Sequence, residues 1–454
     1  MEGVQDAVQL LRSRSRSWIT QQTPGSSRKN YPNILNMKEW LAELGYQTPL
    51  DLNIIHITGT KGKGSTAAFT ESILRAHFQH LSKPIKVGLY TSPHLITERD
   101  RIRVNFKPIS EVAFAQYFFE VWECLRKNVD NDTDMPGYLQ LLVLLSVHIF
   151  KQEMVDVAIY EVHAGGRKDA TNIFENPIAC GFTTIDLDHK DLLGPTIKEV
   201  AWHKSGIMKR GSVAFSIIQE HEVAKDILEK EAAQLGCSLA FIPLHGDLPQ
   251  SLQLTAQKMN ASLAIWLSNT YLNHTGMRQL DLEDIHAGIS RCCWPGRFHR
   301  IEQGSNTWFL DCAHNTLSLP IAMEWFETQV RMSAAQSCPR ILIFGHESER
   351  DTYELIRLIV KYCKEHEFAF DLILLPPYER YGLKIHDDTA EKHAAFWREI
   401  QDTTSIHRVP SLVNALRVAE EQNTREGAQT LITGSTHLVG QALALLEDDE
   451  EREA

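Results

Sequence analysis

Short apolar runs alternate with helical patterns along the N-terminal part of the chain. Nearly continuous apolar runs predict strands at 52–58, 86–92, 155–162, 178–185 and 213–218. Helical patterns stand between them, for example at 65–78 and 138–150. Strands that are apolar on both sides are typical of a sheet covered on both faces. The alternation therefore predicts an α/β fold with a mostly parallel sheet.

This pattern breaks around residues 292–300, where Pro295 and Gly296 interrupt it. A second alternating set follows, with predicted strands at 308–313, 340–345, 370–376 and 429–435. We therefore expect two α/β domains, 1–297 and 298–454. The acidic tail at 447–454 is expected to be solvated.

Composition narrows the class of protein. The chain has 454 residues, of which 43% are hydrophobic, and this is enough for a sizeable core. Its net charge of 46 − 58 = −12 argues against a general nucleic-acid binder but allows a locally basic pocket. Eight scattered cysteines without a CxxC pair suit a reducing compartment and argue against structural zinc or disulfides. Without a membrane-length apolar run or a targeting signal, we expect a cytoplasmic protein, and a mitochondrial form stays open.

The segment IIHITGTKGKGSTAAF, residues 54–69, is the strongest local signal. A predicted strand leads into a loop and then a helix, and the loop comprises Gly59, Thr60, Lys61, Gly62, Lys63, Gly64, Ser65 and Thr66. Glycines let backbone N–H groups point at phosphates, and the helix N-terminus adds partial positive charge. Lys63 can reach the outer phosphates, and the Ser65 hydroxyl can ligate magnesium. The strict GxxxxGK[ST] pattern is not met, because Ile57 and Gly64 replace two of its residues, so a ligand-free turn is the alternative.

Further polar residues stand where strands are expected to end: Ser92, Glu161, His189, Lys204 and Lys209. Ligands of open α/β sheets bind outside the carboxyl ends of the strands. Glu161 and Ser92 offer the oxygen ligands that Mg²⁺ prefers, whereas His189 is a less usual ligand. Spacing alone leaves a strand-end salt bridge open for Glu161 and a capping or core role open for His189.

Together these motifs resemble the folylpolyglutamate synthase family of the Mur-ligase superfamily of ATP-dependent amide ligases. The resemblance runs from about residue 35 to 445 and rests on motifs in family order: HITGTKGKGST, GLYTSPHL, ERDRIRVNFKPIS, GGRKDATNI, LDHKDLLGPTIKEVAWHKSGIMK, WPGRF, LDCAHN and LITGSTHLVG. It implies a P-loop Mur-ligase-type ATPase domain over 1–297 and a smaller Rossmann-like domain over 298–454. It also implies a monomer that uses ATP, Mg²⁺, a folate-type acid and L-glutamate, with K⁺ as an additional cation, and that binds neither nucleic acid nor membrane.

The resemblance also implies roles for single residues. Lys63 and its loop would hold the ATP phosphates, Ser65 and Glu161 one Mg²⁺, and Ser92 and His189 a second one together with Glu161. Lys204 matches a lysine that the family carbamylates, which turns a cation into a metal ligand. The remaining matches are Asn260 near adenine, Arg297 at phosphate, Asp311 at the nucleotide, and His314 and Ser435 near the incoming amino acid. In the implied reaction, ATP phosphorylates the acceptor carboxylate, and the amine of glutamate then displaces phosphate.

The chain departs from the family pattern at a few positions: His163, Ala164, Phe106, Cys312, Leu254 and Ala256. They fit either neutral drift in a folate enzyme or a family member that joins an amino acid to another carboxylic acid. His163 is the candidate acceptor contact, and simple packing beside the turn is its alternative. Dihydrofolate synthesis, ATP hydrolysis without ligation and nucleotide binding without catalysis are the other functions left open.

The loop after Glu161 carries two further expectations. Gly165 and Gly166 should let the chain turn close to a ligand. Arg167 and Asp169 should fix the loop by local pairing.

Overall fold

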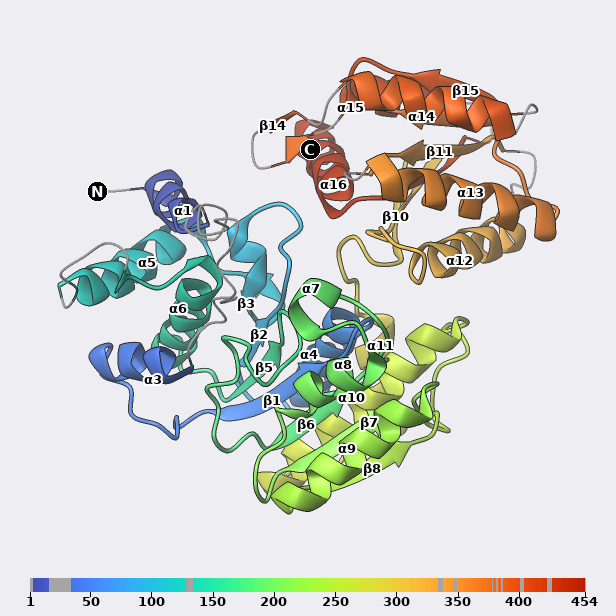
Figure 1. The fold of residues 1–454 in the computed structure, drawn as a ribbon. Coiled ribbons are helices and arrows are strands. Elements are labelled where there is room, and N and C mark those ends of the chain that lie inside the picture. The colour runs from blue at the N-terminus through green and yellow to red at the C-terminus, as the bar shows by residue number, and fades with distance from the viewer. Residues whose placement is uncertain are drawn as a thin grey trace. The chain divides into compact units, whose positions relative to one another are not determined.

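The structure is a computed structural model that divides into two compact units, Met1–Cys292 and Cys293–Ala454 (Figure 1). It describes residues 3–15, 34–127, 129, 134–333, 338–346, 349–377, 379–380, 383–384, 387–400, 404–422 and 427–453. The domain boundary expected at 297 lies a short way inside the second unit.

An eight-stranded sheet forms the centre of the first unit. Its order is β4 (Lys107–Pro108), β3 (Ile102–Val104), β2 (Val87–Tyr90), β5 (Val157–Glu161), β1 (Asn53–Thr58), β6 (Ala179–Phe182), β7 (Val213–Ile217) and β8 (Ser238–Ile242). The strands from β2 to β8 in this order are parallel, and only β3 and β4 pair antiparallel. The expected mostly parallel sheet is therefore confirmed, and the carboxyl ends of its parallel strands share one edge.

Helices cover both faces of this sheet, as the apolar strands predict (Figure 1). One group packs around α4 and comprises α4 (Lys63–His80), α10 (Thr255–His274) and α11 (Leu282–Ser290). A second comprises α1 (Val4–Ser13), α3 (Ile34–Glu43), α5 (Glu111–Arg126) and α6 (Tyr138–Gln152), and a third comprises α8 (Ile197–Ser205) and α9 (Glu222–Leu235). Tyr160 belongs to the second core and Val162 to the third, so these two groups lie on the same face. Short helical turns η1 (Glu98–Arg101) and α7 (Lys190–Leu193) lie in loops.

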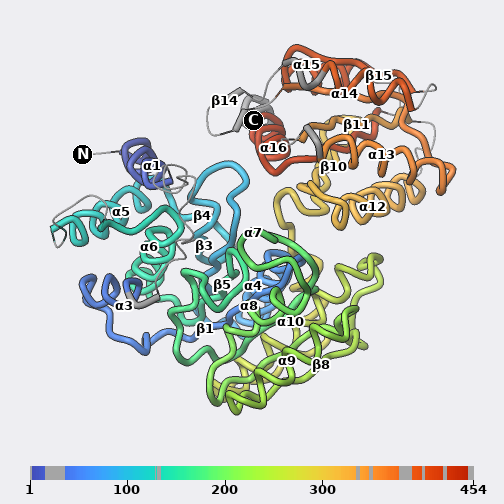
Figure 2. The backbone as a smooth tube through the Cα atoms, in the orientation of Figure 1, coloured from blue at the N-terminus to red at the C-terminus, as the bar shows by residue number. Residues whose placement is uncertain are grey.

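The second unit has its own six-stranded sheet. Its order is β15 (Ser405–Arg408), β12 (Leu372–Leu375), β11 (Arg340–Phe344), β16 (Gln429–Thr433), β10 (Asn306–Leu310) and β9 (His299–Gln303), and only β9 is antiparallel. Its helices are α12 (Leu319–Met332), α13 (Glu349–Glu365), α14 (Asp387–Ile400), α15 (Leu412–Glu421) and α16 (Thr436–Glu453), and β13 (Glu379–Arg380) pairs with β14 (Leu383–Lys384). The backbone tube shows the repeated passage from strand to helix (Figure 2). Within the described residues, no helix has the length and apolar character needed to cross a membrane.

A buried carboxylate joins α11 to α4 in the first unit. Asp284 is fully covered, and its oxygens lie 2.8 Å from His77 Nδ1, 2.8 Å from His80 Nδ1 and 2.9 Å from Arg278 Nη2. Burial works against the charged form, but the hydrogen bonds from His77 and His80 prevail and hold the pKa of Asp284 below its usual value. Asp281 lies close enough to His80 and Asp284 for shared metal binding, but the Arg278 guanidinium already neutralises both carboxylates.

We predict that Asp284→Asn lowers the free energy of unfolding by about 1–3 kcal/mol, because it removes charged hydrogen bonds from a buried site. Because the pKa of Asp284 is lower in the folded protein, its carboxylate stabilises the fold at pH values above about 4, the pKa of an unfolded Asp. This stabilisation is lost as the pH falls below that value. The hydrogen bond to Asp284 raises the pKa of His80 in the folded protein. The stabilisation that the charged His80 contributes is therefore lost as the pH rises above about 6.5, the pKa of an unfolded His. Urea unfolding should therefore show the largest difference from wild type between about pH 4 and 6.5. Glu283→Gln, on the exposed side of α11, is the control, and a pH-independent difference would contradict the assignment.

Candidate nucleotide and metal site

The phosphate loop leads from β1 to α4 at the carboxyl edge of the sheet. Gly59 and Gly62 have φ of +152° and +86°, and a Cβ on either would clash, with Thr183 Oγ1 and Asn260 Oδ1 respectively. Both positions therefore require glycine. No side chain of the described residues caps α4 at Gly62, and its first turn contains no acidic residue. The first N–H groups of this helix are thus available to an anion.

Neighbouring segments hold this loop from two sides. Thr60 donates its N–H to Thr184 O at 2.6 Å and its hydroxyl to Asp186 O at 2.8 Å. Thr66 Oγ1 donates to Asn260 Oδ1 of α10 at 3.3 Å. The loop conformation is therefore set by the protein alone.

Cationic side chains gather around the loop. Lys61 Nζ lies 3.3 Å from Asp188 Oδ2, and Lys63 Nζ lies 3.5 Å from Thr60 O. Lys204 is 2% exposed and donates to Gly59 O at 2.6 Å. Burial first, and then the positive charges of Lys63 and Lys61, hold the pKa of Lys204 well below its usual value. This environment favours the uncharged form of the amine that contacts the loop at Gly59 O.

Two lysines were expected at strand ends, and this expectation is wrong for both. Lys204 lies in the last turn of α8, and Lys209 precedes the start of β7, at the other end of that strand. Lys209 donates to Asn172 Oδ1 at 2.5 Å and to Gly206 O at 2.9 Å. It therefore closes the end of α8 and takes no part in the loop site.

In the Gly-Gly turn, Gly165 has the positive φ (+73°) expected where the chain turns, and Gly166 has a packing role that the sequence did not predict. A Cβ on Gly166 would lie 2.9 Å from the carbonyl oxygens of His203 and Lys204, so this glycine lets α8 approach. Arg167 does not pair locally: it forms an ion pair with Glu231 of α9, and its guanidinium lies 4.3 Å from the centre of the Trp202 ring. Asp169 does act locally and accepts N–H groups from Ala164 and Thr171.

The predicted metal ligands come from separate segments. Glu161 ends β5, is 4% exposed, and accepts the Ser92 N–H at 2.9 Å through Oε2. Ser65 lies in the first turn of α4. His189 precedes α7 in a left-handed conformation, and burial lowers the pKa of its imidazole, which favours the neutral form that can ligate a metal. The charges of Lys63 and Lys204 also influence this pKa, which places His189 near the loop. The carboxylate and the hydroxyls fit Mg²⁺, which prefers oxygen ligands, and the imidazole is the less usual member of the set.

His163 is held by two neighbours. Its Nε2 lies 2.7 Å from Tyr90 Oη, and its Nδ1 lies 3.3 Å from Asp169 Oδ1 without hydrogen-bond geometry. Burial works against the charged form of Asp169, but His163 and the two backbone N–H groups prevail and depress its pKa. The side chain is 7% exposed, so the packing alternative describes what the structure shows, and an acceptor contact remains a prediction.

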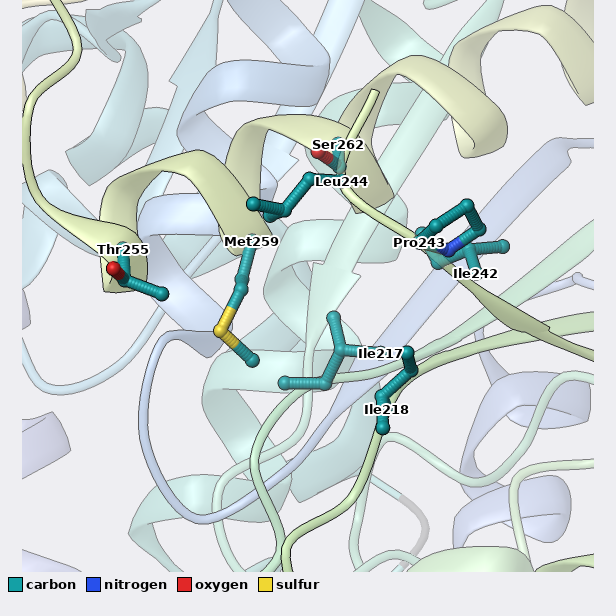
Figure 3. Close-up of a pocket in the computed structure, with 8 residues that line it drawn as sticks. All are labelled: Ile217, Ile218, Ile242, Pro243, Leu244, Thr255, Met259 and Ser262. Atoms are coloured by element: carbon teal, nitrogen blue, oxygen red, sulfur yellow. The ribbon is translucent and has the colours of Figure 1, made fainter. Parts of the chain in front are cut away.

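A small apolar hollow of about 140 Å³ lies at the same sheet edge (Figure 3). Ile217 and Ile218 line it from the end of β7, Ile242, Pro243 and Leu244 from the end of β8, and Thr255, Met259 and Ser262 from the start of α10. Asn260, on the same helix, reaches the phosphate loop. A flat apolar group could therefore lie beside bound phosphates.

The second unit gathers its predicted residues at its own strand ends. Asp311 follows β10 and Ser435 follows the adjacent β16, and the Asp311 N–H donates to Ile432 O at 3.1 Å. Burial raises the pKa of Asp311, while the charge of Arg297 and the N–H groups of Phe298 and Ala313 oppose this. His314 lies in the same segment, with its Nδ1 2.8 Å from Cys312 O.

One neighbour there was missed from the sequence. His346 Nε2 donates to His314 O at 3.1 Å. It stands directly after Gly345 at the end of the predicted strand 340–345, and a histidine at a strand end was the available signal.

Comparison with known proteins tests the resemblance. No protein-family model matches the chain. Folylpolyglutamate synthase of Saccharomyces cerevisiae is 35% identical over 488 aligned residues, which cover 97% of this chain and 86% of that protein. The crystal structure of the Mycobacterium tuberculosis folylpolyglutamate synthase with ADP and AMPPCP superimposes with a TM-score of 0.74 at 22% identity, covering 97% and 98% of the two chains. That of Thermotoga maritima gives 0.75 at 23% identity and 97% of both.

These likenesses extend over both units and confirm the two-part α/β fold. They agree with the order of the sequence motifs from the phosphate loop to the end of β16. The chain therefore belongs to the folylpolyglutamate synthase family of ATP-dependent ligases.

Proposed function

We propose that this protein uses ATP and Mg²⁺ to join L-glutamate to the side-chain carboxylate of a folate or its polyglutamate. The observation that carries the proposal is the uncapped N-terminus of α4, which faces the ligand edge together with Lys63 and close to the buried Glu161. The yeast relative is a folylpolyglutamate synthase, and the E. coli relative FolC, 25% identical with a TM-score of 0.71 over 96% of this chain and 98% of its own, was crystallised with DHPP and ADP.

ATP would bind across the carboxyl edge of the first sheet. The N–H groups at the start of α4 and the Lys63 ammonium would hold its phosphates. The hollow between β7, β8 and α10 would take the adenine, with Asn260 beside it. In the second unit, Arg297 and Asp311 are the proposed nucleotide contacts.

The metal would be held by Ser65, Ser92, Glu161 and His189. Mg²⁺ supplies charge stabilisation for phosphoryl transfer and orients the phosphates. The Glu161 carboxylate is kept in place by the Ser92 N–H, and the Gly59–Thr66 loop by Thr60 and Asn260. This rigidity lets the residues act by positioning and charge, which is what an acyl-phosphate reaction needs.

The reaction would proceed in two balanced steps. An oxygen of the acceptor carboxylate attacks the γ-phosphorus, and ADP leaves. The glutamate amine, positioned by His314 and Ser435, attacks the acyl carbon, phosphate leaves, and the nitrogen loses a proton as the amide forms.

A second candidate is ligation of the amino acid to an acid other than folate. It rests on His163, a large buried side chain at a position where the family pattern has glycine. The same assay separates the two candidates, because only the acceptor differs.

The test measures ADP release with tetrahydrofolate and glutamate, and the mass of the product. We expect a product one glutamyl residue heavier, and Lys63→Ala should lower kcat about 10²- to 10³-fold through loss of charge stabilisation. Turnover only with another acid would replace the folate assignment. ADP release without an amine would indicate an ATPase, and an unaffected Lys63→Ala protein would remove the phosphate-loop mechanism.

Met259→Glu tests the adenine position. A carboxylate in the apolar hollow should raise KM for ATP at least about tenfold, because the buried charge disfavours an aromatic base. KM for the acceptor should stay unchanged. Val223→Glu, on an exposed position of α9, is the matched control, and equal effects of both variants would place the base elsewhere.

Carbamylation of Lys204 is the third test. Burial favours the uncharged form of its amine, which can add CO₂ to give a carbamate and a proton, and Lys63 and Lys61 would stabilise the new negative charge. With ¹³C-bicarbonate, we expect a carbamate signal in the wild type that is absent from Lys204→Gln, and an activity loss of at least about 10²-fold in that variant. A wild type without the signal would leave Lys204 as a neutral donor to Gly59.

A further inference from the structure

Arg101, which has no part in the proposed nucleotide and metal site, is a buried cation without a counter-ion among the described residues. It is 4% exposed and ends η1. Among the described residues, its Nη1 has no hydrogen-bond partner, and no carboxylate lies within ion-pair distance of its guanidinium. Its one side-chain hydrogen bond is the donation from Nε to His94 Nδ1 at 3.0 Å.

Nearby acids are engaged elsewhere. Glu98 accepts Arg12 Nε at 2.6 Å and Nη2 at 3.0 Å. Asp100 accepts the N–H groups of Ile96 and Thr97, at 2.7 and 3.1 Å. Within the described ranges the Arg101 charge is therefore left unneutralised, and burying an unpaired charge is costly.

Position connects Arg101 to the proposed reaction site. Its carbonyl accepts the N–H of Thr91 at 3.0 Å, one residue before Ser92. Burial keeps the pKa of Tyr90 well above its usual value, and the positive charge of Arg101 partly offsets this effect. The Arg101 guanidinium therefore lies close to the Tyr90 phenol. Tyr90 in turn binds His163, two residues beyond Glu161. Arg101 thus lies near the predicted metal ligand Ser92 and, through Tyr90, near His163, the candidate acceptor contact.

We propose that Arg101, oriented by His94, binds a second carboxylate of the acceptor acid, the one that is not phosphorylated. This inference rests on the proposed function, because a glutamyl terminus carries an α- and a side-chain carboxylate and only one reacts. A guanidinium fork matches a carboxylate in shape and charge. The acceptor class is then an acid with two carboxylates a few bonds apart.

A ligand can reach the Arg101 guanidinium only if the neighbouring Tyr138 ring moves. The Tyr138 ring, which is partly exposed at the start of α6, lies 5.6 Å from the Arg101 guanidinium carbon. An arriving carboxylate would displace this ring from the guanidinium and would replace one weak cation–π contact with an ion pair.

The test compares tetrahydrofolate with its α-carboxamide analogue. Wild type should prefer the free acid by about 10- to 100-fold in kcat/KM, the range expected for one charge-assisted pair. In Arg101→Met this preference should fall to near one through KM for the acceptor, while KM for ATP stays unchanged. A preference that persists in Arg101→Met, or an equal loss with both acceptors, would overturn the inference.

Arg103→Met is the matched control, because Arg103 is also buried, at 7% exposed, but donates to the carbonyls of Asp100 and Phe106. This variant should melt at a lower temperature and keep the preference for the free acid. Arg101→Met should not melt below wild type, since it removes an unpaired charge. If Arg101→Met nevertheless fails to fold, Arg101→Lys takes its place in the test. Because lysine lacks the forked donors of a guanidinium, Arg101→Lys should lose at least half of the logarithm of the preference for the free acid.

A binding measurement separates this inference from the proposed function. Tetrahydrofolate should raise the melting temperature of wild type more than its carboxamide does, and Arg101→Met should abolish the difference. Wild type that shows this difference without turnover would reject the ligase assignment and keep the carboxylate site. Turnover of wild type without an Arg101-dependent difference between the two acceptors would keep the ligase assignment and reject the carboxylate site.

Discussion

The approach of α8 to the phosphate loop is the contact on which the rest of the first unit depends. It brings Lys204 Nζ to 2.6 Å from Gly59 O, and it requires the absence of a side chain at Gly166. The same approach lets the Arg167 N–H donate to His203 O at 2.7 Å. The turn after Glu161 is thereby fixed against α8, and Glu161 is held at the loop. A larger residue at Gly166 would act on the metal position through the backbone.

Much of this arrangement could be predicted from the sequence. Continuous apolar runs located the parallel strands, because both faces of each strand are buried, and the glycine–lysine loop located α4. The pattern missed β8, whose burial alternates along an outer strand, and the very short β3 and β4. The turn at Gly165 was predicted, but the approach of α8 that requires Gly166 was not.

Pairing between distant segments was beyond such patterns. Lys204 and Gly59 are 145 residues apart, and Arg167 and Glu231 are 64 apart. Nothing local to either segment encodes these contacts, since only the folded sheet brings the helices and loops together. For the same reason, the sequence could not predict that Arg101 lacks an anionic partner among the described residues, since this depends on which residues pair with Glu98 and Asp100 in the folded protein.

The departures from the family pattern avoid the phosphate loop. His163 and Cys312 have ordinary backbone angles, so neither replaces a glycine that needed positive φ. Phe106 does have a φ of +69°, and its ring lies 5.5 Å from the Arg75 guanidinium carbon and 5.9 Å from that of Arg103.

Burial affects two cationic side chains of the first unit, Lys204 and Arg101, in different ways. Burial lowers the pKa of the Lys204 amine and favours its uncharged form, whereas a guanidinium keeps its proton. Arg101 has no anionic partner among the described residues, and in our proposal a carboxylate of the acceptor supplies one.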